Sequence, residues 1–453
     1  MNEKKDYNSV GIYVWAVFPL IMAMICYFTY KFSFWDNYIV LSNTRAGMFF
    51  YLIWALGIFE SLIVGCSIWR IRENLNVIET LKEKSKYDKW IIAFLLLLLW
   101  SFVSFLLSDD RITSLGLGGC LTEGWLAYVL YAMCFWIAYN LNCENVKGKF
   151  GDYLILVSNV LAFVTVAWEK EQQNLMTFNF ASSTSVFANS NHYGYFLCMT
   201  ILLSFGKYII STCEGLEQND KKFSLKTWAY LASFVFQVYV LMINDTLGAY
   251  VAVIFAMVFT LILWRIRLKG FRATWLIPPI VLIIITYLSY IGIITNLLGE
   301  TIGDCLKDFM RDIMKVSTQS EGYEQAGTNR IFLWKVSIEM IKKHPFIGYG
   351  PEGLTGEYRA ITGGDRPHNE YLQWANFCGI PGLACYLFAL ISLCINRCKK
   401  VVLLDTEDLV IAGAVIAYLI SAFFGVTMYY TVPYLYIFLG FIAGGAKHNL
   451  KKN

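Results

Sequence analysis

Residues 90–108 read WIIAFLLLLLWSFVSFLLS and contain no charged side chain. A helix needs about 20 apolar residues to cross the hydrocarbon core of a bilayer, so this stretch predicts a membrane-spanning helix. The whole composition agrees, because 57% of the residues are hydrophobic and only 15% are charged, against about 25% charged residues in a soluble protein. We therefore expect an all-α, polytopic membrane protein whose surface mostly faces lipid.

Comparable apolar runs recur along the chain and predict about twelve membrane-spanning helices. They lie at residues 11–30, 47–69, 90–108, 121–141, 151–168, 194–211, 228–244, 247–264, 274–296, 377–396, 408–425 and 430–446. Three regions follow: 1–296 with nine spans, 297–376 as one large extracytoplasmic loop, and 377–453 with three spans and a cytoplasmic tail. Only residues 244–246 separate the seventh and eighth spans, so these should form a tight hairpin.

Lysine and arginine set the predicted orientation, because short cytoplasmic loops are enriched in both. Of the 37 Lys and Arg residues, 24 fall in the termini and loops of one side. The short loops of the other side hold only Lys31, Arg45, Arg111 and Lys170. We therefore expect a multi-pass protein of the plasma or inner membrane with both termini in the cytoplasm.

The remaining nine cationic residues lie in the long loop, residues 297–376. Loops longer than about 15 residues are usually functional or disordered, and this one has helical periodicity. Residues 301–316 predict an amphipathic helix at the membrane interface. Residues 330–343 predict a second helix, which the glycines and prolines of residues 344–351 end. The loop should therefore be ordered and carry short helices.

Three arginines and a histidine make this loop a candidate active site: Arg330, Arg359, Arg366 and His368. Arginine binds a diphosphate because it is always charged and can donate two parallel hydrogen bonds. Histidine can accept a proton near neutral pH. The combination indicates group transfer from a lipid diphosphate. The alternative is that the arginines only reach lipid phosphates or surface carboxylates and the histidine is an ordinary polar residue.

Several short motifs resemble the O-antigen ligase/polymerase superfamily of bacterial membrane glycosyltransferases. They are NRIFLWK at 329–335, HPFIGYG at 344–350, PHNEYLQ at 367–373, GIPGL at 379–383 and FANSNHYGYFL at 187–197. Their order, and the placing of one large external loop between late helices, are also similar to that family.

The resemblance implies glycosyl transfer from an undecaprenyl-diphosphate-linked glycan to an acceptor, outside the membrane and without a metal or other cofactor. By that resemblance His368 is the base that deprotonates the acceptor hydroxyl, and Arg330 binds the leaving diphosphate. Arg366 and Arg359 are expected to help bind the substrate. Asn369, Asn191 and His192 are further substrate-binding candidates, although His192 could equally cap the sixth span.

One departure from the family concerns the start of the eighth span. Many members have Ser-Arg-Gly there, and that arginine is thought to face the diphosphate, whereas this chain has NDTLG at 244–248. Either Arg366 or Arg359 substitutes, or the donor binds differently. Asp245 is expected to satisfy backbone amides of the hairpin.

A metal site is not expected. The 12 Cys form no CxxC pair, and Asp365 and Glu370 have no second histidine nearby in sequence with which to form a ligand set. At most one disulfide, between Cys120 and Cys305, is conceivable outside the membrane.

The expected partners are a lipid-diphosphate-linked glycan donor, an acceptor and membrane lipids, with no nucleic acid. The acceptor could be a growing glycan, a lipid core, a cell-wall polymer or a protein, so ligase and polymerase stay open. A transporter or flippase of lipid-linked sugars is the alternative from another class, and a non-catalytic export partner is a third. A flippase usually has short loops, cations within its spans and repeated halves, which this chain lacks, so the enzyme is favoured.

The predicted topology can be checked with reporter fusions in a bacterial host. Alkaline phosphatase, which folds only outside the cytoplasm, should be active when fused after Ser320 and inactive when fused after Asn453. The reverse pattern would contradict the charge-based orientation.

Overall fold

The computed structural model describes most of the chain between residues 10 and 444. The described residues are 10–31, 47–48, 51–62, 65, 89–117, 123–141, 143–175, 186–187, 189–217, 223–296, 299–399 and 404–444. Part of the expected second span, Cys120 and the expected cytoplasmic tail lie outside these ranges.

Within the described ranges the chain is helical, with no strand. Its longer helices are α1 (Val10–Lys31), α4 (Lys89–Leu106), α6 (Trp125–Asn140), α7 (Glu144–Leu175), α8 (Ser190–Glu217), α9 (Leu225–Ile243), α10 (Leu247–Leu268), α11 (Ile277–Tyr290), α12 (Ile302–Thr318), α13 (Arg330–Lys343), α15 (Glu370–Cys398), α16 (Thr406–Ser421) and α17 (Val432–Gly444). The short elements are α5 (Arg111–Leu115), η1 (Ala273–Leu276), η2 (Tyr323–Gln325) and α14 (Thr355–Thr362).

Seven of the described helices are long and apolar enough to cross a membrane: Lys89–Leu106, Glu144–Ala167, Ser190–Glu214, Leu225–Ile243, Leu247–Leu268, Ala273–Tyr290 and Glu370–Cys398. All seven coincide with expected spans. Four shorter apolar helices coincide with others, namely Gly11–Cys26, Tyr51–Leu62, Trp125–Asn140 and Val432–Gly444. The protein is thus an all-helical chain with several candidate spans, and the total of twelve stays a prediction.

Helix α8 is the most enclosed of the seven candidate spans. Its apolar window is 94% buried, whereas the corresponding share for α4 is 28%. It packs against α9, α10 and α16, and a second group of contacts joins α4 with α15 and α6 with α17. A span buried on nearly all sides faces other helices rather than lipid, so α8 forms the core around which the candidate spans assemble.

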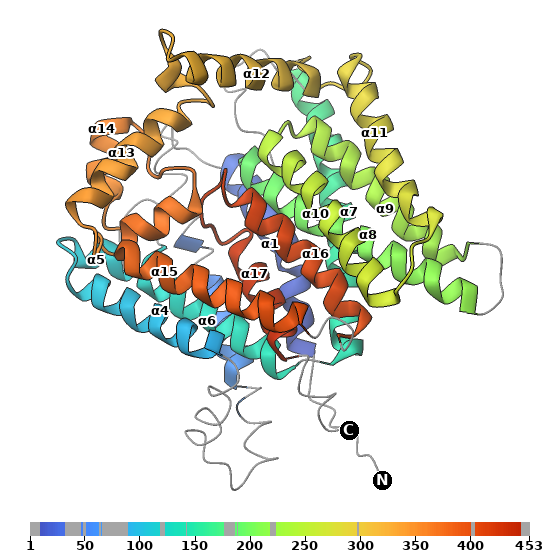
Figure 1. Cartoon of the computed structure of the whole chain (residues 1–453), viewed down its shortest axis with the longest axis horizontal. Helices are drawn as coiled ribbons and strands as arrows, with labels where there is room; N and C mark the ends of the chain where they lie inside the picture. Colours follow the sequence, from blue (N-terminus) through green and yellow to red (C-terminus); the bar gives the residue numbers. More distant parts are fainter. Residues whose placement is uncertain are drawn as a thin grey trace, which may run out of the picture.

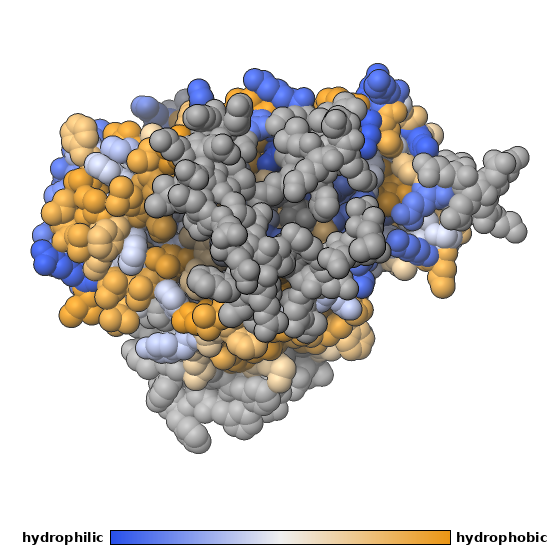
Figure 2. Space-filling view, turned by 90° about the horizontal axis from the view of Figure 1, so that it is seen from below, coloured by the Kyte–Doolittle hydropathy of each residue, from blue (hydrophilic) through white to orange (hydrophobic). Residues whose placement is uncertain are grey.

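Outer helices expose apolar side chains broadly, and the space-filling view shows wide apolar areas (Figure 2). Leu95 and Leu99 of α4 are 56% and 60% exposed, and Ile391 of α15 is 54% exposed. Such large exposed apolar areas are rare on a soluble monomer. They agree with a surface that faces lipid.

Buried ion pairs join α7, α8 and the start of α16. The Lys147 ammonium lies between the carboxylates of Asp405 and Asp408. Lys207 Nζ lies 2.8 Å from Glu407 Oε1 and 3.1 Å from Asp152 Oδ1. Lys147 and Lys207, two of the lysines used to predict the orientation in the membrane, therefore also hold helices together.

The described part of the 297–376 segment contains α12, α13 and α14, the short η2 and the first residues of α15. The predicted helix at 330–343 is confirmed with the same bounds, and the one predicted at 301–316 is confirmed as α12, where Thr301 and Asp304 form a capping box. Helix α12 runs across the top of the view, apart from the helical body (Figure 1). The sequence did not predict α14.

Helix α15 is kinked at Gly379, where the backbone has φ 68° and ψ 177°. The kink interrupts the helical ladder and frees carbonyl groups of the preceding turn. Backbone groups of the turn at 344–350 replace the missing helical partners. Tyr349 N donates to Asn376 O and Gly350 N to Phe377 O, both at 2.9 Å, and Pro345 O accepts from Ile380 N at 2.8 Å.

Helix α4 completes this arrangement from the other side. Trp100 Nε1 donates to Cys378 O at 2.9 Å, and Ser104 Oγ contacts Phe377 O at 2.6 Å. An unpaired carbonyl is costly away from water, so these donors explain how the kink is tolerated. The HPFIGYG motif thus docks the 297–376 segment onto α4 and α15.

Gly379→Ala should destabilise the protein by about 2 kcal/mol or more, since a side chain in this backbone region costs about 1–3 kcal/mol. The added Cβ would also lie 2.1 Å from Phe346 O. Gly356→Ala is the matched control, because nothing lies within 4 Å of its Cβ position. Thermal unfolding in detergent, followed by tryptophan fluorescence, measures both. Equal melting temperatures for the two variants would show that the kink is not a structural requirement.

Candidate active site

His368 lies in the short segment between α14 and α15, and the residues on both sides of it are held in place. Its backbone is left-handed, with φ 49°. Trp334 Nε1 of α13 donates to Pro367 O at 2.9 Å. Asn369 Oδ1 accepts from Tyr371 N at 3.0 Å and so caps α15. These bonds present the His368 side chain in a defined direction.

The imidazole of His368 is half-buried and makes no hydrogen bond or ion pair to the part of the chain that is described. Burial lowers its pKa below the ordinary value of 6.5; the Asp365 carboxylate opposes this effect, while Arg330 and Arg366 add to it. The ring is therefore neutral at neutral pH and able to accept a proton.

Arg330 is the first residue of α13, and its guanidinium lies within electrostatic reach of His368 and of Tyr195 on α8. Three successive residues before it have left-handed backbone, with φ between 59° and 66° at 327–329. Gly327 N donates to Asp312 Oδ2 of α12 at 2.8 Å, which ties this turn down. Within the described ranges the half-buried guanidinium has no carboxylate partner, so its charge is available to a ligand.

His192, in the first turn of α8, completes the cluster. It is 8% exposed, and its ring stacks on Tyr430 with centroids 5.4 Å apart. Its Nδ1 is buried and has no hydrogen-bond partner among the described residues. His368 and Asp365 lie within electrostatic reach. An aromatic contact rather than a helix cap therefore holds His192 next to the 297–376 segment.

Asn191 precedes His192 and is half-exposed, and its backbone N–H donates to Asn189 Oδ1 at 2.9 Å. Arg359 lies on α14 and is also half-exposed. No described contact joins Arg359 to Arg330 or His368. The structure thus brings Arg330, His368 and His192 together and leaves Arg359 on a separate helix.

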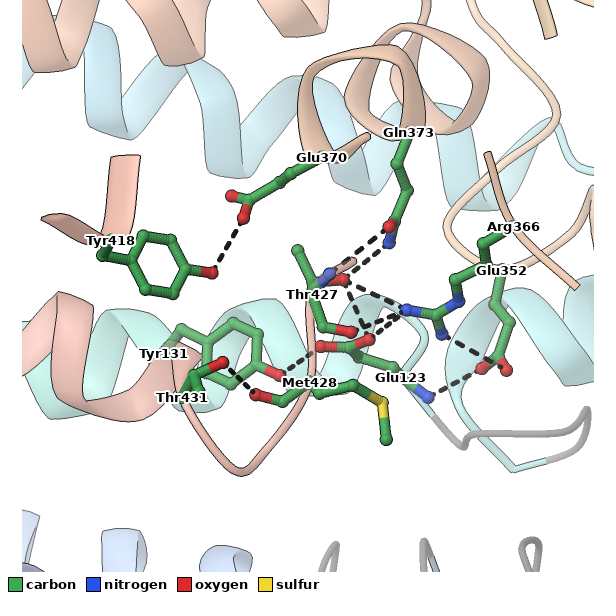
Figure 3. A network of polar contacts seen from close by, with 10 residues as sticks. All are labelled: Glu123, Tyr131, Glu352, Arg366, Glu370, Gln373, Tyr418, Thr427, Met428 and Thr431. Atoms are coloured by element: carbon green, nitrogen blue, oxygen red, sulfur yellow. Dashed lines mark hydrogen bonds and ion pairs between the residues drawn. The ribbon is translucent and has the colours of Figure 1, made fainter. Parts of the chain in front are cut away.

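Arg366 differs from the other arginines because its side chain is fully buried between two carboxylates (Figure 3). Its Nη1 bonds Glu123 Oε2, and its Nη2 lies 3.7 Å from Glu352 Oε1. Nη1 also donates to Thr427 O at 2.9 Å. Its charge is already balanced, so the expected direct contact with the substrate is not supported by this geometry, and we treat Arg366 as a positioning residue.

The sequence-based reasoning did not pair Glu123 or Glu352 with Arg366. Glu123 lies at the start of an expected span and Glu352 in a turn with left-handed backbone, φ 58°. An acidic residue at the outer end of an apolar run was the available signal, because such a charge needs a partner. Its partner lies 243 residues away in the chain, which no local pattern indicates.

The prediction that Asp245 satisfies backbone amides of the hairpin was wrong. The hairpin between α9 and α10 is tight, as predicted, but the carboxylate accepts from Cys305 Sγ at 2.7 Å and Asn296 Nδ2 at 3.2 Å, not from hairpin amides. It therefore links the hairpin to the start of α12. Cys305 is a free thiol, and its conceivable disulfide partner Cys120 lies outside the described residues.

Asn369 was expected to bind substrate, yet its oxygen already caps α15. Asn369→Ala should therefore lower stability by about 1 kcal/mol, the usual value of an N-cap, whereas Asn369→Asp keeps the cap and should leave the unfolding temperature nearly unchanged. The measurement is thermal unfolding of both variants in detergent. An unchanged stability of the alanine variant, with weaker substrate binding, would instead make Asn369 a substrate contact.

Comparison with known proteins identifies the region that carries most of this cluster. Residues 232–387, about a third of the chain, match the O-antigen ligase family model. This stretch includes Arg330 and His368, but neither His192 nor Glu123. No curated protein matches the chain. Residues 232–387 thus form an O-antigen ligase domain.

Proposed function

We propose that this protein is a membrane glycosyltransferase that moves a glycan from an undecaprenyl-diphosphate carrier to an acceptor on the extracytoplasmic side. The observation that supports it most is that Arg330 lies within electrostatic reach of His368. Neither side chain has a hydrogen-bond or ion-pair partner among the described residues. Both lie in the region that matches the O-antigen ligase family. One offers a free positive charge and the other a neutral imidazole.

In the proposed reaction His368 accepts the proton of the acceptor hydroxyl. The oxygen then attacks the anomeric carbon of the donor sugar and forms the new glycosidic bond. The bond from that carbon to the diphosphate oxygen breaks, and the lipid diphosphate leaves with the electron pair. The base is suited to this step because its lowered pKa keeps it unprotonated at neutral pH.

Arg330 is proposed to balance the charge that develops on the leaving diphosphate. A preorganised cation at the site of developing charge is a strong source of transition-state stabilisation. Arg359 is the remaining arginine of the original set that is exposed enough to add a second contact, because Arg366 is balanced by two carboxylates. This assignment matters since the start of the eighth expected span, residues 244–248, lacks the arginine that many members of the family have there. The reaction then needs no metal.

His192 and Asn191 are proposed to line the donor side of the site. His192 is mostly enclosed, with an unpartnered ring nitrogen that a donor hydroxyl or phosphate could bond. Asn191 is more exposed and lies directly before it. Neither contributes a charge at neutral pH, which suits recognition of sugar hydroxyls.

The proposed location is the plasma or inner membrane, with the 297–376 segment outside and both termini in the cytoplasm. Ligase and polymerase share the donor chemistry and differ in the acceptor. A growing glycan, a lipid core, a cell-wall polymer or a protein each presents a hydroxyl that His368 can activate.

His368→Ala should lower transfer by about 100-fold or more, the usual contribution of a general base. Arg330→Ala should lower it by about 100- to 1,000-fold, as for loss of an oxyanion-stabilising donor, and Arg330→Lys should recover part of the loss. Vesicles containing the purified protein and a lipid-diphosphate-linked glycan measure transfer directly, with candidate acceptors supplied one at a time.

Lys335→Ala is the matched control for Arg330→Ala. Lys335 lies on the same helix, but its exposed ammonium pairs with Glu324 at 2.6 Å, so transfer should change less than about twofold, as for an exposed ion pair. Full transfer by folded His368→Ala and Arg330→Ala would rule out this site. Movement of the donor across the bilayer without transfer would favour a flippase.

A further inference from the structure

Three buried ionisable side chains, those of Arg366, Glu123 and Glu352, form a cluster, and Arg366 lies two residues before His368 in the chain. Arg366 is 1% exposed, and Glu123 and Glu352 are both 0% exposed. The backbone N–H of Glu123 donates to Glu352 Oε2 at 2.7 Å, so the two acidic residues are also linked through a main-chain hydrogen bond. One cation thus faces two acids in a buried environment, where the low dielectric constant strengthens interactions between charges.

The cluster joins segments that are far apart in the chain (Figure 3). Glu123 precedes α6, Glu352 follows the HPFIGYG turn, and Arg366 precedes α15. Tyr131 Oη donates to Glu123 Oε1 at 2.5 Å, and Thr427 Oγ1 donates to Glu123 Oε2 at 2.9 Å. The Arg366 side chain is therefore held both by Glu352 of its own loop and by Glu123 and Thr427, which lie next to helices far away in the chain.

The connection from Arg366 to His368 is short and stiff. Only Pro367 separates them, its φ is restricted by its ring, and its carbonyl is bonded by Trp334. On the other side Glu370 N donates to Ala422 O at 2.9 Å. A displacement of Arg366 would therefore move His368, which has no side-chain bond of its own in the described chain.

The two residues are also connected through charge. The cations that act on His368 are Arg330 of α13 and Arg366, the carboxylate is Asp365, and the remaining titratable group is His192 of α8. The influence of Arg366 depends on how completely Glu123 and Glu352 balance it.

We propose that Glu123 and Glu352 are positioning residues for His368: they hold Arg366 in place and balance its charge, and so set both the placement of the imidazole and the charge that it experiences. This inference rests on the proposed role of His368 as the base. It adds two acidic residues to the machinery, one of them from outside the region that matches the family.

The charge effect has a definite sign. Glu123→Gln removes one of the two negative charges that act against Arg366, which disfavours protonation of His368. The midpoint of its titration should fall by about 0.5 to 1 unit, less than the effect of about 1–3 units from a charge in direct contact. The loss of transfer on acidification, which occurs as His368 takes up a proton, should move to lower pH by the same amount.

A direct titration separates this inference from the proposed function. Diethyl pyrocarbonate reacts with the neutral imidazole, so its rate of reaction with His368 measures the unprotonated fraction of that ring. The rate is measured by peptide mass spectrometry over a series of pH values. The purified full-length protein in detergent is used, so no donor or acceptor is required. A merely structural ion pair would alter the unfolding temperature without moving this midpoint.

Three variants and a control complete the test. Glu352→Gln, whose contact with Arg366 is longer at 3.7 Å, should shift the midpoint in the same direction and serves if Glu123→Gln does not fold. Glu123→Gln combined with Arg366→Gln removes the positive charge of Arg366 as well and should return the midpoint to or above the wild-type value. Glu339→Gln removes an exposed acid of α13 that pairs with Lys342 and should change nothing.

Folded Glu123→Gln and Glu352→Gln proteins with an unchanged or raised midpoint would overturn the inference. So would a double variant whose midpoint stays as low as that of Glu123→Gln. Normal transfer by His368→Ala would instead refute the proposed function, and it would do so whatever the titration shows.

Discussion

The buried contact of Arg366 with Glu123 and Glu352 is the interaction on which the candidate site depends. It joins the 297–376 segment to helices that begin far earlier in the chain, and all three side chains are removed from solvent. Removing one partner of such a buried group usually costs about 3–5 kcal/mol, because the remaining charge stays buried without balance. The arrangement favours one position of the segment strongly over alternatives in which the charges separate.

The kink of α15 is the second constraint, and it has a backbone origin. A broken helical ladder inside an apolar assembly must find other partners. Here the HPFIGYG turn and side chains of α4 supply them. The glycines of this motif thus have a packing role, since a Cβ at Gly348 or Gly379 would lie 2.6 Å or 2.1 Å from backbone oxygen of the opposing segment. The turn holds the C-terminal end of α13, and α13 begins with Arg330.

Helices were predictable because their signals are local. Apolar runs gave the positions of the candidate spans, and the periodicity of residues 330–343 gave α13 with its observed bounds. The short spacing at 244–246 correctly indicated a hairpin. The number of spans was harder to predict. Helices α6, α16 and α17 have 16, 16 and 13 residues, and length alone does not decide whether helices this short cross the membrane.

Long-range pairing was not predictable from the sequence. Arg366 was grouped with the substrate-binding arginines because its residue type and position suited a diphosphate, but it is buried against Glu123, 243 residues away, and against Glu352 on the other side of α14. Asn369 was grouped likewise, although its place directly before a helix also fits an N-cap. Asp365 and Tyr195 were not recognised because neither stands in a pattern that indicates proximity to His368 or Arg330.

The most direct test of the account is a structure of the full-length protein, in a lipid disc, bound to a non-hydrolysable lipid-diphosphate-linked glycan, determined by electron cryo-microscopy. The account predicts that the diphosphate lies against the Arg330 guanidinium and that the anomeric carbon faces the His368 imidazole across a space open to an acceptor hydroxyl. A diphosphate bound elsewhere, with His368 and Arg330 both remote from the donor, would contradict it.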